Sequence, residues 1–72
     1  MLTLTAYIEY DPETGLYAGF VPGIPGAHSQ GKTLDELQKN LQEVLELCIE
    51  ENAIPIENLP RFVGVQQIQV DA

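Results

Sequence analysis

The sequence predicts an α+β domain with the element order β-β-β-α-β, in which one helix covers one face of a four-stranded sheet. Three observations predict this class. The stretch "LTLTAYIEY" (2–10) alternates apolar and polar residues with a period of two, which is typical of a half-buried strand. An apolar stripe at helical spacing runs from Leu34 to Ile49, and "RFVGVQQIQV" (61–70) is rich in β-branched residues.

A hairpin is expected after the first strand. In "DPETG" (11–15), Pro12 presets the φ of a turn, and Gly15 can adopt the positive φ that closes it. The stretch "LYAGFV" (16–21) is then the returning strand. The first two strands are therefore predicted to be antiparallel neighbours.

The next segment is expected to be a loop followed by a short strand. Pro22 and Pro25 cannot donate to a sheet ladder, so "PGIPG" (22–26) is not a central strand. The stretch "AHSQ" (27–30) is long enough only for a short strand, which we place at an edge of the sheet.

The helix has the clearest signals in the chain. Thr33 can cap its first turn, and Glu36 stands three residues later, as in a capping box. The helix is predicted to run to Glu51 or Asn52, because Pro55 prevents its continuation. Seven apolar side chains fill one stripe of about 140° on this helix: Leu34, Leu37, Leu41, Val44, Leu45, Cys48 and Ile49.

The last strand is expected over residues 61–70, after a proline-rich connector at 54–60. Its alternation is imperfect, and a bulge near Gln66–Gln67 would return its apolar side chains to one face. No linker or repeat divides the chain, so residues 1–72 are predicted to form a single domain.

The sheet face opposite the helix is predicted to be bare and to mediate self-association. A domain of 72 residues is marginally stable alone, and its single cysteine excludes an internal disulfide. We therefore expect a homo-oligomer, a dimer or a tetramer. Tyr7, Tyr17 and Val21 are the predicted interface residues on the bare face. The core set expected on the other face is Leu4, Ile8, Leu16 and Phe20.

The charge balance points to a basic partner. Eleven acidic residues against three basic ones give a net charge of −8. Nucleic acid and anionic membrane surfaces would repel such a chain, so neither is an expected partner. No apolar run approaches the roughly 20 residues that a membrane span requires, and no signal peptide is visible. We expect a cytoplasmic protein.

The acidic residues gather on the second half of the helix. Asp35 and Lys39 form a favourable pair four residues apart, but no basic residue of the helix follows them. Glu43, Glu46 and Glu50 do follow, and acids near a helix C-terminus oppose its macrodipole. This local cost favours a surface kept acidic for a basic partner, so these three are the predicted partner-binding residues. A merely solvated face is the alternative.

One stretch imitates a nucleotide-binding motif. "GAHSQGKT" (26–33) fits the phosphate-loop pattern G-x-x-x-x-G-K-[ST]. A genuine phosphate loop follows a hydrophobic strand of a parallel sheet, whereas "VPGIPG" (21–26) is broken by proline and only one helix is expected. No nucleotide or other cofactor is therefore predicted.

No catalytic or metal site is expected. His28 is the only histidine and has no partner for a triad or a metal, and Cys48 falls on the apolar stripe of the helix. Glu9, Asp11 and Glu13 crowd one end of the hairpin, where such acids are usually solvated. A vestigial nuclease that uses these hairpin acids is the enzymatic alternative.

Residues 7–51 resemble the N-terminal domain of HicB-like antitoxins. That family has a strand, a D/E-x-x-x-G hairpin, Y-x-A, a P-x-x-P-G loop, and G-x-T before an acidic amphipathic helix. The residues at matching places are Asp11, Gly15, Tyr17, Ala18, Pro22, Pro25, Gly26, Gly31, Thr33 and Glu36.

The resemblance implies a partial ribonuclease-H-like sheet with the strand order 3-2-1-4. It also implies a function without enzymatic activity, namely neutralising HicA, a small basic toxin that cleaves mRNA. Complete HicB antitoxins carry a C-terminal DNA-binding domain; this chain ends at Ala72, and no such domain is expected. The alternative is an orphan, non-enzymatic oligomeric interaction module with a non-toxin partner.

Overall fold

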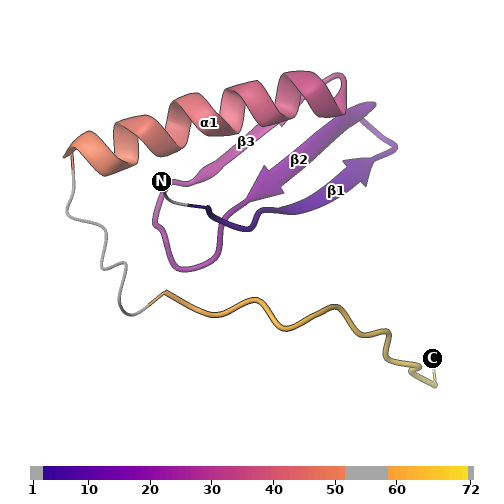
Figure 1. Cartoon of the computed structure of the whole chain (residues 1–72). Helices are drawn as coiled ribbons and strands as arrows, with labels where there is room; N and C mark the ends of the chain where they lie inside the picture. The colour runs from indigo at the N-terminus through magenta and orange to yellow at the C-terminus, as the bar shows by residue number, and fades with distance from the viewer. Residues whose placement is uncertain (1–2, 52–58, 72) are drawn as a thin grey trace.

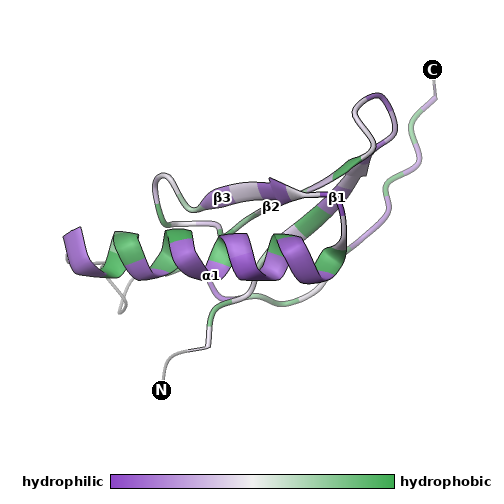
Figure 2. Ribbon diagram, turned by 90° about the horizontal axis from the view of Figure 1, so that it is seen from above, coloured by the Kyte–Doolittle hydropathy of each residue, from purple (hydrophilic) through white to green (hydrophobic). Residues whose placement is uncertain are grey.

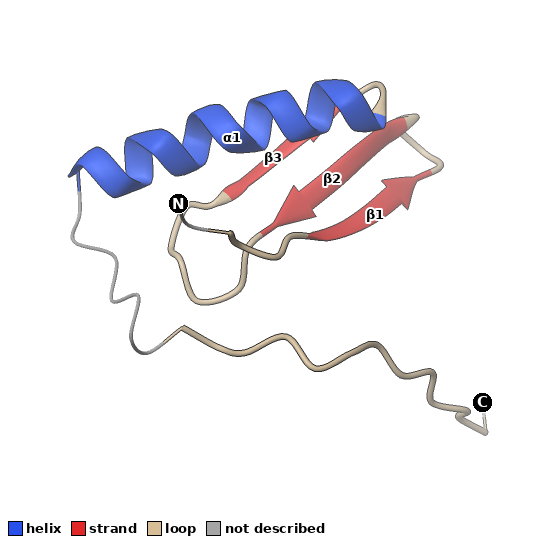
Figure 3. Ribbon diagram, viewed as in Figure 1, coloured by secondary structure: helices blue, strands red, loops and turns tan. Residues whose placement is uncertain are grey.

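The computed structural model describes residues 3–51 and 59–71. It contains β1 (Tyr7–Asp11), β2 (Leu16–Phe20), β3 (His28–Gly31) and α1 (Leu34–Glu51). The strands form an antiparallel sheet in the order β1-β2-β3, and α1 lies across one of its faces (Figures 1 and 3). The predicted α+β class and the order β-β-β-α are confirmed.

The predicted fourth strand is not formed. Residues 59–71 contain no strand, although this segment runs beside β1 in the same direction (Figure 1). A strand needs hydrogen bonds from a neighbouring sheet edge, and β-propensity alone supplies none of them. The sheet therefore has three strands within the described residues, and most of the expected connector lies outside them.

The hairpin between β1 and β2 closes as predicted around Gly15, whose φ is +72°. The Gly15 N–H donates to the Asp11 carbonyl at 2.8 Å. The Asp11 carboxylate accepts a second hydrogen bond from the Glu13 N–H at 2.9 Å. The turn sets the register, in which Asp11 pairs with Leu16 and Tyr7 with Phe20.

This register corrects the predicted faces of the sheet. Gly19 lies under the helix, because a Cβ added there would lie 3.0 Å from the Leu41 side chain. Ile8 pairs with Gly19 and shares its face, whereas Leu16 and Phe20 alternate with Gly19 and point to the other face. The predicted core set is therefore wrong for Leu16 and Phe20, whereas Leu4 packs against the core and Ile8 lies on the helix side but is 51% exposed.

The same register places two of the predicted interface residues on the helix side. Tyr17 and Val21 share the parity of Gly19, and Val21 is only 5% exposed in the core. Tyr17 packs on Tyr10 with ring centroids 5.0 Å apart, whereas Tyr7 packs on Phe20 at 5.5 Å on the opposite face. Alternation orders side chains within one strand, but only the hairpin register relates one strand to the next.

Two glycines let α1 approach the sheet closely. Leu37 and Leu41 are buried against β2 and β3. A Cβ on Gly31 would lie 2.6 Å from the Leu37 backbone nitrogen, and a Cβ on Gly19 would lie 3.3 Å from the Leu37 side chain. The absence of side chains at these two positions therefore determines how near the helix sits.

A second cluster of buried residues fills the space beneath the C-terminal half of α1. Val21, Ile24 and Ala27 form it, with Leu45 and Cys48 of the helix packed against it. The loop folds back on itself, because the Val21 N–H donates to the Ala27 carbonyl at 2.9 Å. The stretch "PGIPG" (22–26), predicted only to be a loop, thus contributes Ile24 to the core.

The predicted capping box is present at the start of α1. The Glu36 N–H donates to Thr33 Oγ1 at 3.1 Å, and the Leu37 N–H donates to the Thr33 carbonyl at 3.0 Å. The Glu36 carboxylate accepts from the Lys32 N–H at 3.1 Å, one residue before the usual partner. The Asn40 side chain also ties the helix to β3, donating to the Gln30 carbonyl at 2.8 Å.

We expect Gly31→Ala to lower the free energy of unfolding by about 1–3 kcal/mol, because the new methyl group would push the helix backbone away from the sheet. Urea denaturation followed by circular dichroism measures this change. Gly64→Ala is the matched control, since no atom of the described residues lies within 4 Å of a Cβ added there. Equal stability of the two variants would contradict the close-approach role of Gly31.

We expect Thr33→Ala to lower the free energy of unfolding by about 1 kcal/mol, because it removes the hydroxyl that caps α1. Thr33→Ser keeps the hydroxyl and should retain most of the stability. Thermal melts of the three proteins test this, and a serine variant as unstable as the alanine variant would argue against the cap.

Candidate functional site

The acidic helix face is the first candidate surface. It consists of Glu43, Glu46 and Glu50, all of which are exposed. At 100° per residue these three fall within an arc of about 60°, on the side of α1 opposite the buried Leu37 and Leu41. The last turn of α1 contains no basic residue. The structure therefore brings the three predicted residues together on a surface that the sheet does not cover.

The bare sheet face is the second candidate surface. Its members point away from α1, as the strand register requires. The helix α1 packs on the opposite face, and its ribbon carries alternating hydrophobic and hydrophilic bands (Figure 2). The bare sheet face consists of Tyr7, Glu9, Asp11, Leu16, Ala18, Phe20, His28 and Gln30.

Of the three predicted interface residues, Tyr7 alone lies on the bare sheet face. Its ring stacks on Phe20 and meets the edge of Phe62, with centroids 5.5 Å and 5.9 Å apart. Phe20 and Phe62 were missed by the sequence reasoning. Since Phe20 follows Gly19 in the strand, the two must lie on opposite faces. This alternation places Phe20 on the bare sheet face only once Gly19 is known to face the helix.

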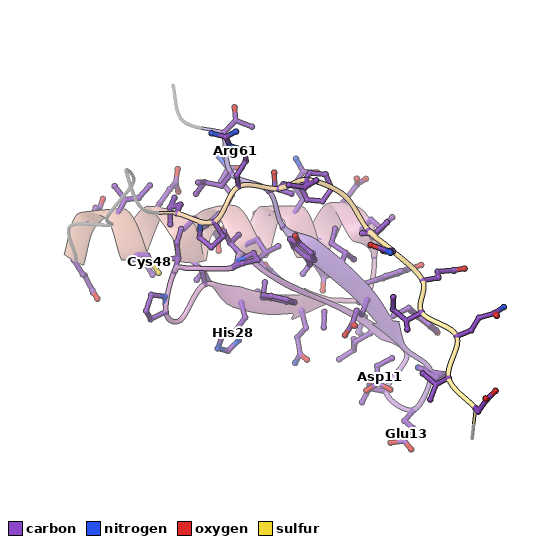
Figure 4. All side chains as sticks on the ribbon, turned by 90° about the horizontal axis from the view of Figure 1, so that it is seen from below. Asp11, Glu13, His28, Cys48 and Arg61 are labelled. Carbon is purple, nitrogen blue, oxygen red and sulfur yellow. The ribbon has the colours of Figure 1, made fainter. Side chains whose placement is uncertain are left out.

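The residues considered for chemistry do not converge. Asp11 and Glu13 lie at the tip of the hairpin, while His28 and Cys48 lie far from them toward the other end of the domain (Figure 4). Within residues 3–51 and 59–71, no three His, Cys, Asp or Glu side chains are placed to hold a metal ion. The Asp11 carboxylate is engaged in its own turn, which gives this acid a structural role.

Cys48 is a partly buried free thiol beside the second core cluster. Its thiol donates a weak hydrogen bond to the Pro25 carbonyl, with sulfur and oxygen 3.9 Å apart. The side chain thus joins α1 to the proline-rich loop and acts as a small core residue.

The stretch "GAHSQGKT" does not form a phosphate-binding loop. Its central residues are the extended strand β3, an edge strand in an antiparallel sheet. The Lys32 N–H donates to the Glu36 carboxylate, so an acid occupies the place where a phosphate oxygen would bind. The motif is a strand-to-helix connection with a capping box.

Comparison with known proteins gives a consistent family assignment. The family model described as UPF0150-like matches residues 4–52. The chain belongs to the UPF0150 family. A UPF0150 protein of Thermotoga maritima is 51% identical over 67 residues, which are 93% of this chain and 88% of that protein. A UPF0150 protein of Synechocystis is 48% identical over 63 residues, covering 88% and 87% of the two chains.

The similarity of this UPF0150 chain to its relatives extends past the sheet and helix. An alignment over 93% of the chain includes most of residues 59–71, which the family model does not cover. No solved structure gives a significant match. Among the described residues, no helix combines the length and the apolar character needed to cross a bilayer.

We expect Lys32→Ala to leave thermal stability and self-association unchanged, because only the backbone N–H of Lys32 takes part in the capping interaction. Isothermal titration with MgATP should give no binding to either protein. ATP binding by the wild type that disappears in the variant would show that the motif is functional.

Proposed function

We propose that this protein is a HicB-like antitoxin, or an antitoxin-derived domain, that binds and neutralises a small basic HicA-type toxin that cleaves mRNA. The acidic helix face carries the proposal. Exposed, clustered glutamates at the C-terminal half of a helix oppose the helix macrodipole, so their presence is better explained by binding than by stability.

The whole-chain charge supports the same partner. A net charge of −8 attracts a basic protein over a distance and accelerates its association. A ribonuclease must be basic where it holds its RNA substrate, so an acidic protein seated on that surface would compete with RNA. Inhibition would then need no catalysis by the antitoxin.

The family resemblance supplies the second line of support. The hairpin Asp11 and Gly15 and the helix-capping Thr33 and Glu36 are the HicB-like motif positions. The structure gives each a structural reason: Asp11 and Gly15 close the hairpin, and Thr33 and Glu36 start α1. The motif therefore specifies the scaffold that presents the acidic helix face.

We expect Glu43→Gln/Glu46→Gln/Glu50→Gln to slow association with a HicA-type toxin by about tenfold or more, because electrostatic steering is lost. Surface plasmon resonance measures the rate, and an RNA cleavage assay measures inhibition. Wild-type association should also slow as NaCl is raised, since salt screens exposed charges.

The matched control is Glu9→Gln/Glu13→Gln/Asp71→Asn, three acids away from the acidic helix face. Each triple variant changes the net charge from −8 to −5, because three negative charges are neutralised. A specific site predicts a large effect only for the helix variant. Equal effects would indicate that net charge alone matters, and undiminished RNA cleavage by a toxin encoded beside the gene would remove the proposed function.

The bare sheet face favours a second candidate, an orphan oligomeric interaction module whose partner is not a toxin. The aromatic contact of Tyr7 with Phe20 lies on a face that α1 does not cover, so it can bind protein without any toxin. A gene with no short basic reading frame beside it would favour this candidate.

A further inference from the structure

The C-terminal segment has a sequence typical of a β-strand but pairs with no strand among the described residues. Val63, Val65, Ile68 and Val70 are 91%, 85%, 72% and 76% exposed. Residues 62–70 contain no charged side chain, although the whole chain carries a net charge of −8. Four β-branched apolar side chains within eight residues, all open to water, require burial against another surface.

The start of this segment is anchored to the domain. Leu59 packs against the core cluster of Val21, Ile24 and Ala27. The Phe62 ring meets Tyr7 edge-on, with centroids 5.9 Å apart. Residues 59–62 are therefore held beside the N-terminal end of β1, and residues 63–70 project from this fixed point along the β1 side of the molecule (Figures 1 and 4).

β1 offers a free edge but no covered face. It is the outer strand of the sheet, and within residues 3–51 and 59–71 only β2 pairs with it. The helix packs on β3 and β2 and does not reach β1. On the helix side, Ile8 and Tyr10 of β1 consequently remain 51% and 55% exposed. Pairing of residues 63–70 with β1 of the same chain would widen the sheet but would still leave the side chains of Ile8 and Tyr10 uncovered.

The molecule exposes more surface than a compact monomer of its mass. Its accessible surface is 6266 Å², against about 4,400 Å² for a folded 7.9 kDa monomer. Its radius of gyration is 13.9 Å, against about 11 Å for a compact chain of 72 residues. The excess area of about 1,900 Å² exceeds the roughly 800 Å² that each partner buries in a standard interface.

We propose that residues 63–70 form a strand on a second copy of this chain, adding to the free edge of β1 in a reciprocal exchange. Each copy carries one segment 63–70 and one free β1 edge. Two copies related by a two-fold axis can therefore each donate a strand to the other's β1. The exchange brings the exposed apolar residues of both β1 layers together. Residues 63–70 are uncharged, so they add no negative charge beside Glu9 and Asp11 of β1. This assembly does not depend on toxin binding.

Sedimentation equilibrium of the full chain tests the association. We expect a dimer of the 7.9 kDa chain at micromolar concentration, and Val65→Lys should weaken it at least tenfold by placing charges in the new sheet. Leu47→Lys is the matched control, because Leu47 is also an exposed apolar residue but lies on α1, and it should leave the dimer intact. Gln66→Pro, which removes a backbone donor without adding charge, should act like Val65→Lys.

Cross-linking between differently tagged chains tests the exchange itself. One chain carries Cys48→Ala and Ile8→Cys, and the other carries Cys48→Ala and Val65→Cys. A short bismaleimide should join the two tags when the proteins are mixed. A monomer at micromolar concentration, a dimer unaffected by both Val65→Lys and Gln66→Pro, or links formed only within a single chain that carries both cysteines would each overturn the proposal.

Discussion

The close approach of α1 to the sheet is the constraint on which the rest of the structure depends. Gly31 and Gly19 present backbone instead of side chains, so Leu37 and Leu41 can sit directly on β3 and β2. The cap formed by Thr33 and Glu36 sets where the helix begins, and so where Leu37 and Leu41 fall on the sheet. The Asn40 side chain then ties α1 to β3. A single 18-residue helix seated so close to two strands cannot also cover a third.

The sheet surfaces that α1 does not cover are the ones available for binding another protein. α1 leaves β1 exposed on the helix side, and nothing among the described elements packs broadly on the opposite sheet face. The C-terminal segment carries apolar side chains beyond the same strand. In a larger domain a second helix would bury such a layer; the described residues contain one helix, and the proposed second copy would cover the layer instead.

The acidic helix face and the apolar C-terminal segment lie on different sides of the domain, which separates the two proposed interactions. The acidic helix face points away from the sheet, while β1 and residues 62–70 lie on the far side of β2 from the helix contact (Figure 2). Self-association through β1 and residues 63–70 would therefore leave the glutamates of α1 accessible. A dimer of this kind would present two acidic helix faces, which raises the effective concentration of binding sites for a basic partner.

The sequence by itself determined the local elements: the hairpin around Gly15, the capped helix after Thr33, and the acidic cluster at Glu43, Glu46 and Glu50. These depend on contacts a few residues apart, which spacing and turn chemistry predict. Only the tertiary structure decided which side chains share a sheet face and whether residues 61–70 pair. Tyr17 and Val21 were misplaced because hairpin register, not alternation, relates neighbouring strands. The last segment stays unpaired because a strand exists only where another edge accepts its hydrogen bonds.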